Sequence, residues 1–341
     1  MSDKELKKSF ETVTSSNDFS GVVFVKGDTE VLFDSAFGFA NRAEKQLNTV
    51  HTRFGIASGC KLFTAIAICQ LVEKGLLSFS TKLKDCLDVA FPHFNEKVTI
   101  HHLLTHSSGI PDYFDEEEMD DFEDLWKRTP MYLLRNSHDF LPLFQNRKMM
   151  FEPGEKFHYN NAAFIVLGLV VEKLSGLSFT DYVEANIFKR CGMNDSGYFS
   201  LDQLPANTAY GYINNEDGTW RTNMYSIPVK GGADGGAYIT APDMVRLWEA
   251  LFDNQLLSEK YTELLSTPHI HVKEGVAYGY GLWINKRDDD SIVKYHVMGY
   301  DPGVSFHSAY YPDCGIKIAI PSNKDSGPSK VMKAMEECFT S

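Results

Sequence analysis

The sequence predicts an α/β (α+β) protein in which one antiparallel sheet, built from both ends of the chain, is flanked by helices and accompanied by a mainly helical insertion. Three observations support this fold class. Strand-like runs occur near the N-terminus, similar runs return in the last quarter of the chain, and residues 81–229 alternate amphipathic helical patterns with loops. The simplest assembly joins the two sets of strands in one sheet. It divides the chain into a sheet domain of residues 1–80 and 230–341 and a helical domain of residues 81–229.

The N-terminal region is expected to contain a short polar helix and then a β-hairpin. The polar helical pattern covers residues 5–14. Residues 22–25 and 31–39 are rich in Val, Leu and Phe, and the segment Lys26-Gly-Asp-Thr29 between them has turn composition. Sheet formation therefore starts close to the N-terminus.

Residues 58–74 form the most apolar helical pattern of the chain. They are apolar on nearly all sides and end at Gly75, which is typical of a buried helix with a glycine cap. We expect this helix to run through the middle of the molecule. The later elements follow from the same kinds of pattern: helices over residues 162–174, 240–251 and 329–338, and strands over residues 278–284, 292–297, 304–310 and 316–320.

Composition excludes some classes of function. The formal net charge of −13 disfavours nucleic acid and anionic membranes as partners. No apolar segment has the length of a signal peptide or a membrane span, so we expect a cytoplasmic protein, with an exported parent shortened to this chain as the alternative. The six cysteines lie far apart, which favours reduced thiols. His102 and His106 have zinc-compatible spacing but no third ligand, so no metal or other cofactor is expected.

The segment Ser58-Gly-Cys-Lys61 places a hydroxyl and an amine three residues apart at the start of the predicted buried helix. Residues at this spacing share a helix face, so the amine can reach the hydroxyl. A desolvated lysine can accept the proton of a serine, and the N–H groups of the helix N-terminus lie beside the reacting oxygen. The same pattern at Ser291-Ile-Val-Lys294 lies in a strand-like run, where alternation separates the side chains.

A second candidate segment is Phe157-His-Tyr-Asn-Asn161, just before an apolar helix. Tyr159 is either a half-buried aromatic residue or a base whose phenol pKa is lowered by a nearby ammonium. We interpret Asn160 as the helix N-cap, and the amide of Asn161 can bind a substrate carbonyl.

Together these segments resemble the serine β-lactamase and penicillin-binding-protein superfamily, in particular class C β-lactamases and the related D-Ala-D-Ala carboxypeptidases and esterases. The resemblance spans nearly the whole chain. The matching segments, in order, are Phe54-Gly-Ile-Ala-Ser-Gly-Cys-Lys61, Val98-Thr-Ile-His-His-Leu-Leu-Thr-His-Ser-Ser-Gly-Ile-Pro-Asp-Tyr113, Phe151-Glu-Pro-Gly154, Tyr159-Asn-Asn161, Leu167-Gly168, Gly235-Gly-Ala-Tyr-Ile-Thr-Ala-Pro-Asp243 and Tyr278-Gly-Tyr-Gly-Leu-Trp283.

The resemblance implies a β-lactamase/transpeptidase-like fold with the active site between the two domains. It implies acyl transfer through a covalent ester, with Ser58 as nucleophile, Lys61 as its proton partner, Tyr159 as second base and Asn161 as ligand of a substrate amide. A small molecule or a peptide is the expected partner. Oligomeric state is left open, as is the choice between β-lactamase, D,D-peptidase and esterase. A binding or regulatory protein with weak turnover is the alternative.

The sequence departs from the family pattern at the edge strand. Relatives carry Lys-Thr-Gly or His-x-Gly there, whereas counting back from Pro302-Gly303 places Val297-Met-Gly299 at that position. His296 supplies the missing imidazole only if the strand register slips by one residue. The backbone N–H of Gly299 or Tyr300 still completes an oxyanion hole. Losing the cation weakens carboxylate recognition and shifts the expected substrates toward neutral esters or amides.

The acidic run of residues 115–124 directly follows one of the family segments. Such runs are most often solvated. Its position in the sequence leads us to the hypothesis of an acidic rim that disfavours anionic substrates. The glycine-rich segment 231–236 lacks the Lys-Ser/Thr of a nucleotide-binding loop, so tight turns beside the active site are expected there.

Overall fold

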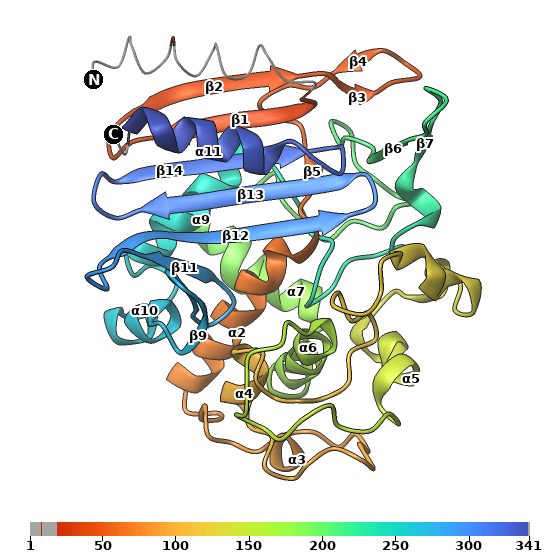
Figure 1. Ribbon diagram of the computed structural model, residues 1–341, viewed down its shortest axis with the longest axis vertical. Coiled ribbons are helices and arrows are strands. Elements are labelled where there is room, and N and C mark those ends of the chain that lie inside the picture. Colours follow the sequence, from red (N-terminus) through yellow and green to blue (C-terminus); the bar gives the residue numbers. More distant parts are fainter. Residues whose placement is uncertain (1–7, 9–18, 340–341) are drawn as a thin grey trace.

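Strands from both ends of the chain form one eight-stranded antiparallel sheet in the order β2-β1-β14-β13-β12-β11-β10-β9 (Figure 1). The structure is a computed structural model that describes Lys8 and residues 19–339; the helix expected over residues 5–14 lies outside this part, Lys8 excepted. The strands are β1 (Gly21–Lys26), β2 (Val31–Phe37), β9 (Ile270–Lys273), β10 (Val276–Tyr278), β11 (Trp283–Lys286), β12 (Ile292–Asp301), β13 (Val304–Tyr311) and β14 (Ile316–Ser322). Pairing of β1 with β14 confirms the predicted joining of the two chain ends.

Two strands predicted as continuous are interrupted at glycines. The run 31–39 breaks at Gly38, where φ is 71°, and continues as β3 (Phe39–Asn41), which pairs with β4 (Gln46–Leu47). The run 278–284 is divided by a turn at residues 279–282, between β10 and β11. A Cβ at Gly281 would lie 2.6 Å from the Cβ of Ala65 and 2.8 Å from the carbonyl oxygen of Lys61, so only glycine fits this turn against the central helix.

The two faces of the sheet are covered by different helices. Helix α11 (Pro328–Phe339) packs on one face against β13 and β14, and Val331 and Met335 belong to the hydrophobic cluster on that face. Helix α9 (Ala241–Phe252), capped by the side chain of Thr240 as predicted, packs on the other face. Trp248 of α9 donates a hydrogen bond to Ser308 of β13 at 2.8 Å. Side chains of successive strand residues therefore enter two separate cores.

The helix predicted over residues 58–74 is confirmed, with a different first turn. Residues Ala57–Cys60 form a 3-10 turn, η1, and α2 covers Lys61–Glu73. Every residue of α2 before Glu73 is buried. Helix α6 (Asn161–Ser175) crosses α2 and is buried along most of its length. These two helices bring residues about 100 positions apart in the sequence to the middle of the molecule (Figure 1).

The middle of the chain contains less regular helix than predicted. Proline recurs at positions 111, 130, 142 and 153, and short turns there are capped locally by Asp121 and Asn136. The remaining elements are α3 (Leu83–Cys86), α4 (Ile100–Leu104), η2 (Phe122–Lys127), η3 (Met131–Leu133), η4 (Ser137–Phe140), α5 (Leu141–Phe144), α7 (Phe179–Val183), η5 (Glu184–Phe188), α8 (Lys189–Cys191), β5 (Phe54–Gly55), β6 (Tyr212–Asn214), β7 (Trp220–Thr222), η6 (Asn223–Tyr225), β8 (Tyr238–Ile239) and α10 (Glu259–Ser266).

No single helix in the described part of the chain is both long and apolar enough to cross a membrane; only α6 joined to residues Phe179–Cys191 passes the length and composition criteria, with a bend of 74° between them.

Candidate active site

Ser58 lies in the 3-10 turn that leads into the buried helix α2. The preceding residue, Ala57, has a φ of 45°, which is uncommon for a residue with a Cβ. Two backbone hydrogen bonds hold the turn, from Ile56 N to Ala237 O at 3.0 Å and from Gly236 N to Ala57 O at 3.2 Å. Strained backbone of this kind persists where its surroundings fix it, and it concentrates at functional sites. The local conformation therefore supports Ser58 as the nucleophile.

Lys61 is the buried partner of Ser58. Its side chain is enclosed, with 1% of the residue exposed, and its Nζ donates to Ser58 Oγ, Asn161 Oδ1 and the carbonyl oxygen of Asp234, each at 2.8 Å. A lysine ammonium has three N–H donors, and the three acceptors match them. The predicted contact between hydroxyl and amine is thus present, and a proton can pass directly between Ser58 and Lys61.

Tyr159 lies against the same amine. The centre of its ring is 4.9 Å from Lys61 Nζ, 4.4 Å from the tilted ring of His106 and 6.2 Å from the nearly parallel ring of Trp283. A side-chain hydrogen bond links its phenol to Ser58. The structure therefore brings Tyr159 to Ser58 and Lys61 from a segment about 100 residues further along the sequence.

The electrostatics of Tyr159 differ from the sequence-based expectation of a lowered phenol pKa. Burial raises the pKa of Tyr159 well above its usual value, the nearby carboxylate of Glu116 raises it further, and the hydrogen bond with Ser58 lowers it only in part. The phenol is consequently protonated in the resting protein. Tyr159 is better placed to donate a proton than to take the first one from Ser58.

The ring of His106 packs against the ring of Tyr159. Sequence reasoning did not identify His106 as a site residue. It is fully buried, its Nδ1 accepts from Asn160 N at 3.0 Å, and its Nε2 is 3.2 Å from Tyr278 Oη. Burial lowers the pKa of His106 well below its usual value, and the charge of Lys61 lowers it further. An uncharged imidazole whose two nitrogens both have hydrogen-bond partners has a structural role. His106 lies within the family segment of residues 98–113, and this membership is the sequence signal that could have identified it.

Asn161 holds Lys61 and is itself held by several acceptors. Its Oδ1 accepts from Lys61, and its Nδ2 donates to Phe114 O at 3.2 Å, to Asp112 Oδ2 at 3.3 Å and to Glu116 Oε1 at 3.5 Å. Glu116 is the exposed member of this set. A substrate carbonyl that binds Nδ2 must therefore compete with Glu116 for the amide.

Asp112 fixes the start of α6 beside the site. Its carboxylate accepts from Asn161 N at 2.6 Å and from Ala162 N at 2.9 Å, while Asn160 caps the helix, as predicted, by accepting from Ala163 N at 2.7 Å. Burial raises the pKa of Asp112 to about 7, although these N–H donors oppose the shift. Asp112 therefore acts as a positioning residue for Asn161.

The edge strand β12 passes directly over the turn that carries the nucleophile. A Cβ at Gly299 would lie 2.0 Å from Ile56 O and 2.8 Å from Ser58 N. Only a glycine permits this approach. His296 is the last residue of β12 that pairs with β11, and its partner is Trp283. The residues of β12 after His296 have no partner in β11. The geometry therefore leaves the backbone of Gly299 and Tyr300 beside Ser58, where a second oxyanion donor is expected.

His296 does not supply a cation to this site. Its side chain is buried, with Nε2 2.7 Å from Asn285 Oδ1 and Nδ1 3.2 Å from His307 Nε2. Burial lowers the pKa of His296 well below its usual value, and His307 and Lys294 add to the shift. The alternative with a register slip is therefore wrong: β12 is in the register that puts His296 in a buried pair with His307.

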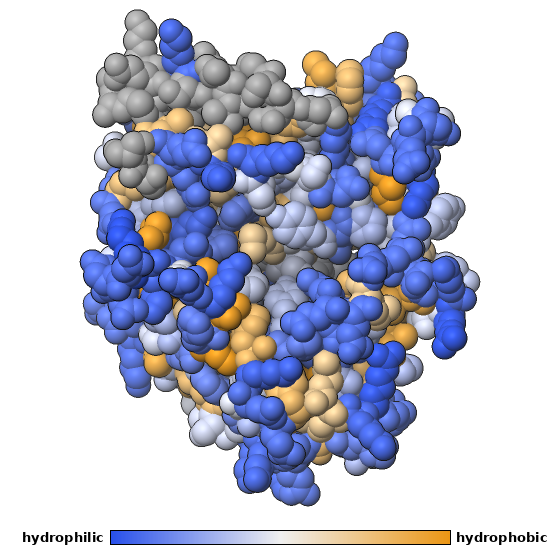
Figure 2. Space-filling model, viewed as in Figure 1, coloured by the Kyte–Doolittle hydropathy of each residue, from blue (hydrophilic) through white to orange (hydrophobic). Residues whose placement is uncertain are grey.

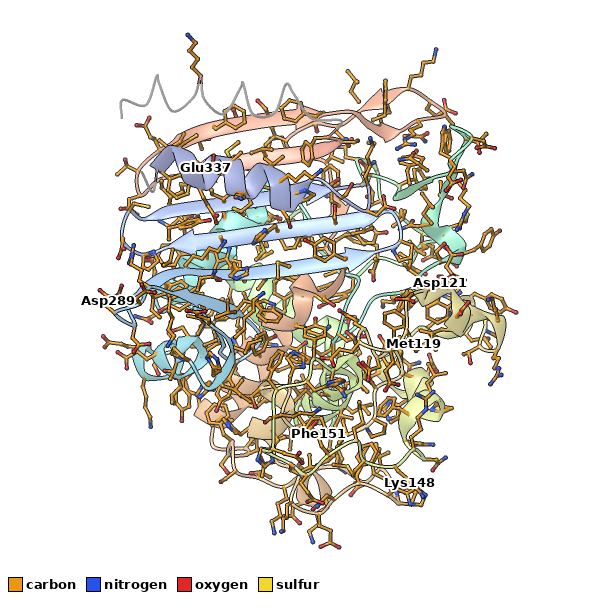
Figure 3. The ribbon with its side chains drawn as sticks, in the orientation of Figure 1. Met119, Asp121, Lys148, Phe151, Asp289 and Glu337 are labelled. Carbon is orange, nitrogen blue, oxygen red and sulfur yellow. The ribbon has the colours of Figure 1, made fainter. Side chains whose placement is uncertain are left out.

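A cavity of about 460 Å³ opens next to Ser58, and Figure 2 shows that the surface is hollowed between the sheet and the helices below it. Tyr300, 51% exposed, lines it and its hydroxyl is 2.6 Å from Ser329 Oγ. Figure 3 places Met119 and Asp121 beside the C-terminal end of β12. Aromatic and aliphatic side chains form much of the wall: Phe114, Phe122, Phe140, Phe199, Ile227 and Val304.

The acidic run of residues 115–124 contributes to this cavity only in part. Glu116, Asp120 and Asp121 line the cavity. Asp115 instead is buried and accepts from His158 Nε2 at 3.0 Å. Of the acidic run, the cavity is therefore lined by Glu116, Asp120 and Asp121, while Asp115 is engaged with His158.

Comparison with known proteins identifies the family. The Beta-lactamase family model matches residues 7–336. Penicillin-binding protein 4* of Bacillus subtilis is 29% identical over 352 residues, covering 98% of this chain and 75% of the relative. A penicillin-binding protein from Bacillus halodurans has a crystal structure that is 59% identical, with a TM-score of 0.94 over 97% of this chain and 100% of that one. A D-amino acid amidase from Ochrobactrum anthropi, 20% identical with a TM-score of 0.79 over 98% of this chain and 99% of that one, shows the same fold.

Proposed function

The chain belongs to the Beta-lactamase family, and from this premise we propose that it is a serine hydrolase that cleaves an amide or ester through an acyl-enzyme on Ser58. The observation that carries the proposal is the 2.8 Å contact between Lys61 Nζ and Ser58 Oγ at the start of a buried helix. If Ser58 were only a surface N-cap and Lys61 a solvated lysine, the side chain of Lys61 would be exposed instead of buried.

The proposed reaction has two steps. Ser58 Oγ attacks the carbonyl carbon while Lys61, which has first released one of its three protons to solvent, accepts the hydroxyl proton. The oxyanion is held by the backbone N–H of Ser58 and by one from Gly299 or Tyr300. Collapse of the tetrahedral intermediate breaks the bond to the leaving group, which takes the phenol proton of Tyr159, and Lys61 returns its proton to Tyr159. Water then hydrolyses the ester by the reverse set of transfers, which frees Ser58.

The competing proposal is a binding or regulatory protein with weak turnover, and it rests on one observation. Val297 stands where family members carry a cationic residue, and its side chain is buried in the core. This substitution affects recognition of a substrate carboxylate. The positions of Ser58 and Lys61 and the close approach of β12 do not depend on the residue at position 297. They favour an enzyme over a binding protein.

Intact-protein mass spectrometry tests the proposal. Wild-type protein, Ser58→Ala and the matched control Ser291→Ala are each incubated with a penicillin, a cephalosporin and a fluorophosphonate. Ser291 belongs to the other Ser-x-x-Lys pattern but lies exposed in the turn before β12. We expect an adduct on the wild type and on Ser291→Ala, and none on Ser58→Ala. Stable β-lactam adducts would indicate slow deacylation of a penicillin-binding type, and fluorophosphonate adducts alone an esterase or amidase. A wild type that forms no adduct would favour the binding protein.

A further inference from the structure

The cavity beside Ser58 is lined by many more carboxylates than cations. Its acidic lining residues are Glu116, Asp120, Asp121, Asp234, Asp301 and Asp325. Lys230 is the one lysine or arginine among the described lining residues. Because these charges surround a partly enclosed volume next to the nucleophile, they favour a cationic substrate and repel an anionic one.

Asp301 lies on β12 two residues after Gly299, and this spacing sets the direction of its side chain relative to Ser58. A side chain at Gly299 would point at Ser58 N, and residues two apart on a strand project from the same face. The side chain of Asp301 therefore projects toward the turn that carries Ser58, about 7 Å further along β12. Tyr300, between the two, projects to the opposite face and bonds Ser329.

Asp301 also lacks a partner. Within the described residues its carboxylate makes no hydrogen bond and no ion pair, although Lys61 lies close enough to act on it electrostatically. Asp301 is half-buried, so its carboxylate is partly desolvated, and partial desolvation without an ion-pair partner is unfavourable. Burial raises the pKa of Asp301 to about 7, and the neighbouring Asp234 and Glu116 raise it as well. A positively charged group in the cavity would relieve this cost.

The neighbouring carboxylates differ in how far they are already engaged. Asp234 is 6% exposed, accepts a hydrogen bond from Tyr113 Oη and presents its backbone oxygen to Lys61. Glu116 is exposed and touches the amide of Asn161. Asp234 is thus held by partners of its own, although burial raises its pKa, and Glu116 is the solvent-exposed carboxylate near Asp301.

We propose that Asp301, backed by Asp234 and Glu116, binds a protonated amine of the substrate a few bonds from the carbonyl that Ser58 attacks. The substrate class is an amide or ester of an amine-bearing acid, such as an aminoacyl compound, whose apolar part lies on Phe114, Phe122 and Phe199 of the wall. This proposal rests on the proposed function, because it places the amine relative to an acyl group on Ser58.

The experiment compares three fluorophosphonates of equal length that end in an ammonium, a neutral acetamide or a carboxylate. Rates of Ser58 labelling are measured at low ionic strength for wild type, Asp301→Asn and Asp289→Asn. Asp289 is an exposed carboxylate in the turn before β12, at the opposite end of the sheet from Met119 and Asp121 (Figure 3). The neutral reagent is the internal reference, because a structural defect slows all three reagents equally.

We expect the ammonium reagent to label the wild type at least about tenfold faster than the carboxylate reagent, and Asp301→Asn to reduce that ratio to about threefold or less. Asp289→Asn should keep the wild-type ratio. Equal labelling of the wild type by all three reagents, or an unchanged ratio in folded Asp301→Asn, would overturn the assignment while leaving the proposed function intact. A wild type that none of the reagents labels would overturn both.

Discussion

Lys61 carries an amine into the interior, and the surrounding acceptors show how the protein accommodates it. Three oxygen atoms at 2.8 Å match its three donors, and one of them belongs to the nucleophile. A buried charge that loses its partners is costly, whereas replacing it by an apolar side chain of similar length can be neutral for stability. In the proposed mechanism this lysine serves the reaction, so its removal should lower activity without lowering stability.

Replacing Lys61 by Met is expected to lower the rate of Ser58 acylation by about 10³-fold, because a general base of this kind contributes about 10²–10⁴-fold. The melting temperature should be unchanged or higher. Fluorophosphonate labelling kinetics and thermal denaturation measure the two effects on the same sample. Acylation within a factor of about three of the wild-type rate would show that Lys61 is not the base.

Gly299 is the residue at which the backbone of β12 and the nucleophile turn come closest. A methyl group there would meet Ile56 O at 2.0 Å, so Gly299→Ala must push the strand away from Ser58. We expect acylation to slow by about 10²-fold or more and the free energy of unfolding to fall by about 1–3 kcal/mol. Gly27→Ala in the β1–β2 turn is the control, since its nearest contact would be an ordinary 3.6 Å to Leu32. Wild-type acylation by Gly299→Ala would contradict the assignment of the oxyanion hole to β12.

At the scale of elements, β12 and β13 join the site to a buried histidine pair on the other face of the sheet. If Asn285 Oδ1 is the acceptor at 2.7 Å, His296 Nε2 carries the proton and His296 Nδ1 must accept from His307 Nε2. His307 Nδ1 then remains without a hydrogen-bond partner. The pair is held neutral in a place that disfavours protonation.

This pair predicts a loss of stability in acid. Burial lowers the pKa of His307 from 6.5 to about 3, and the charge of Lys294 adds to the shift. Between these values the unfolded chain binds a proton that the folded protein does not, so stability falls as the pH decreases through this window. Each group that binds a proton only in the unfolded chain lowers the free energy of unfolding by up to about 1.4 kcal/mol per pH unit of acidification.

His307→Gln should therefore flatten the decline of melting temperature between about pH 6.5 and pH 4 relative to wild type. His93→Gln, at an exposed histidine, should leave the wild-type slope. Thermal denaturation in a series of buffers of equal ionic strength gives the three slopes. The explanation would be wrong if the His307→Gln slope equalled that of the wild type.

At the scale of the whole molecule, the site exists where three separate parts of the chain meet. The nucleophile turn and α2 come from the N-terminal quarter, α6 and its preceding loop from the middle, and β12 from the C-terminal quarter (Figure 1). The net charge of −13 adds a long-range field to the local carboxylates of the cavity. Association with charged reagents should therefore depend on salt.

Raising the ionic strength from about 0.01 M to about 1 M shortens the screening length from roughly 30 Å to roughly 3 Å. We expect labelling of Ser58 by the ammonium fluorophosphonate to slow several-fold over this range, while labelling by the neutral reagent stays nearly constant. The carboxylate reagent should accelerate. Parallel time courses at a series of NaCl concentrations provide the measurement, and identical salt dependence for all three reagents would argue against electrostatic selection.

Much of the fold could be predicted from local patterns. Alternation of apolar residues located the strands at both chain ends, and the apolar run ending at Gly75 located the central helix, because burial of these residues follows from their own composition. The interruptions at Gly38 and Gly281 could not be predicted in this way, because the contacts that require glycine come from other parts of the chain, Ser20 at Gly38 and helix α2 at Gly281. The loops of the middle region likewise depend on side-chain caps that compete with helix formation.

By itself, the sequence determined that Lys61 can reach Ser58 and that both lie at the start of a buried helix, since spacing and composition carry that information. Only the tertiary structure decided which face each residue of β12 presents. A strand alternates with a period of two, so its register decides that His296 pairs with His307 while Gly299 and Asp301 face the nucleophile. Burial and net charge in the cavity are sums over distant segments, which is why the carboxylates around Ser58 could not be assembled from the sequence alone.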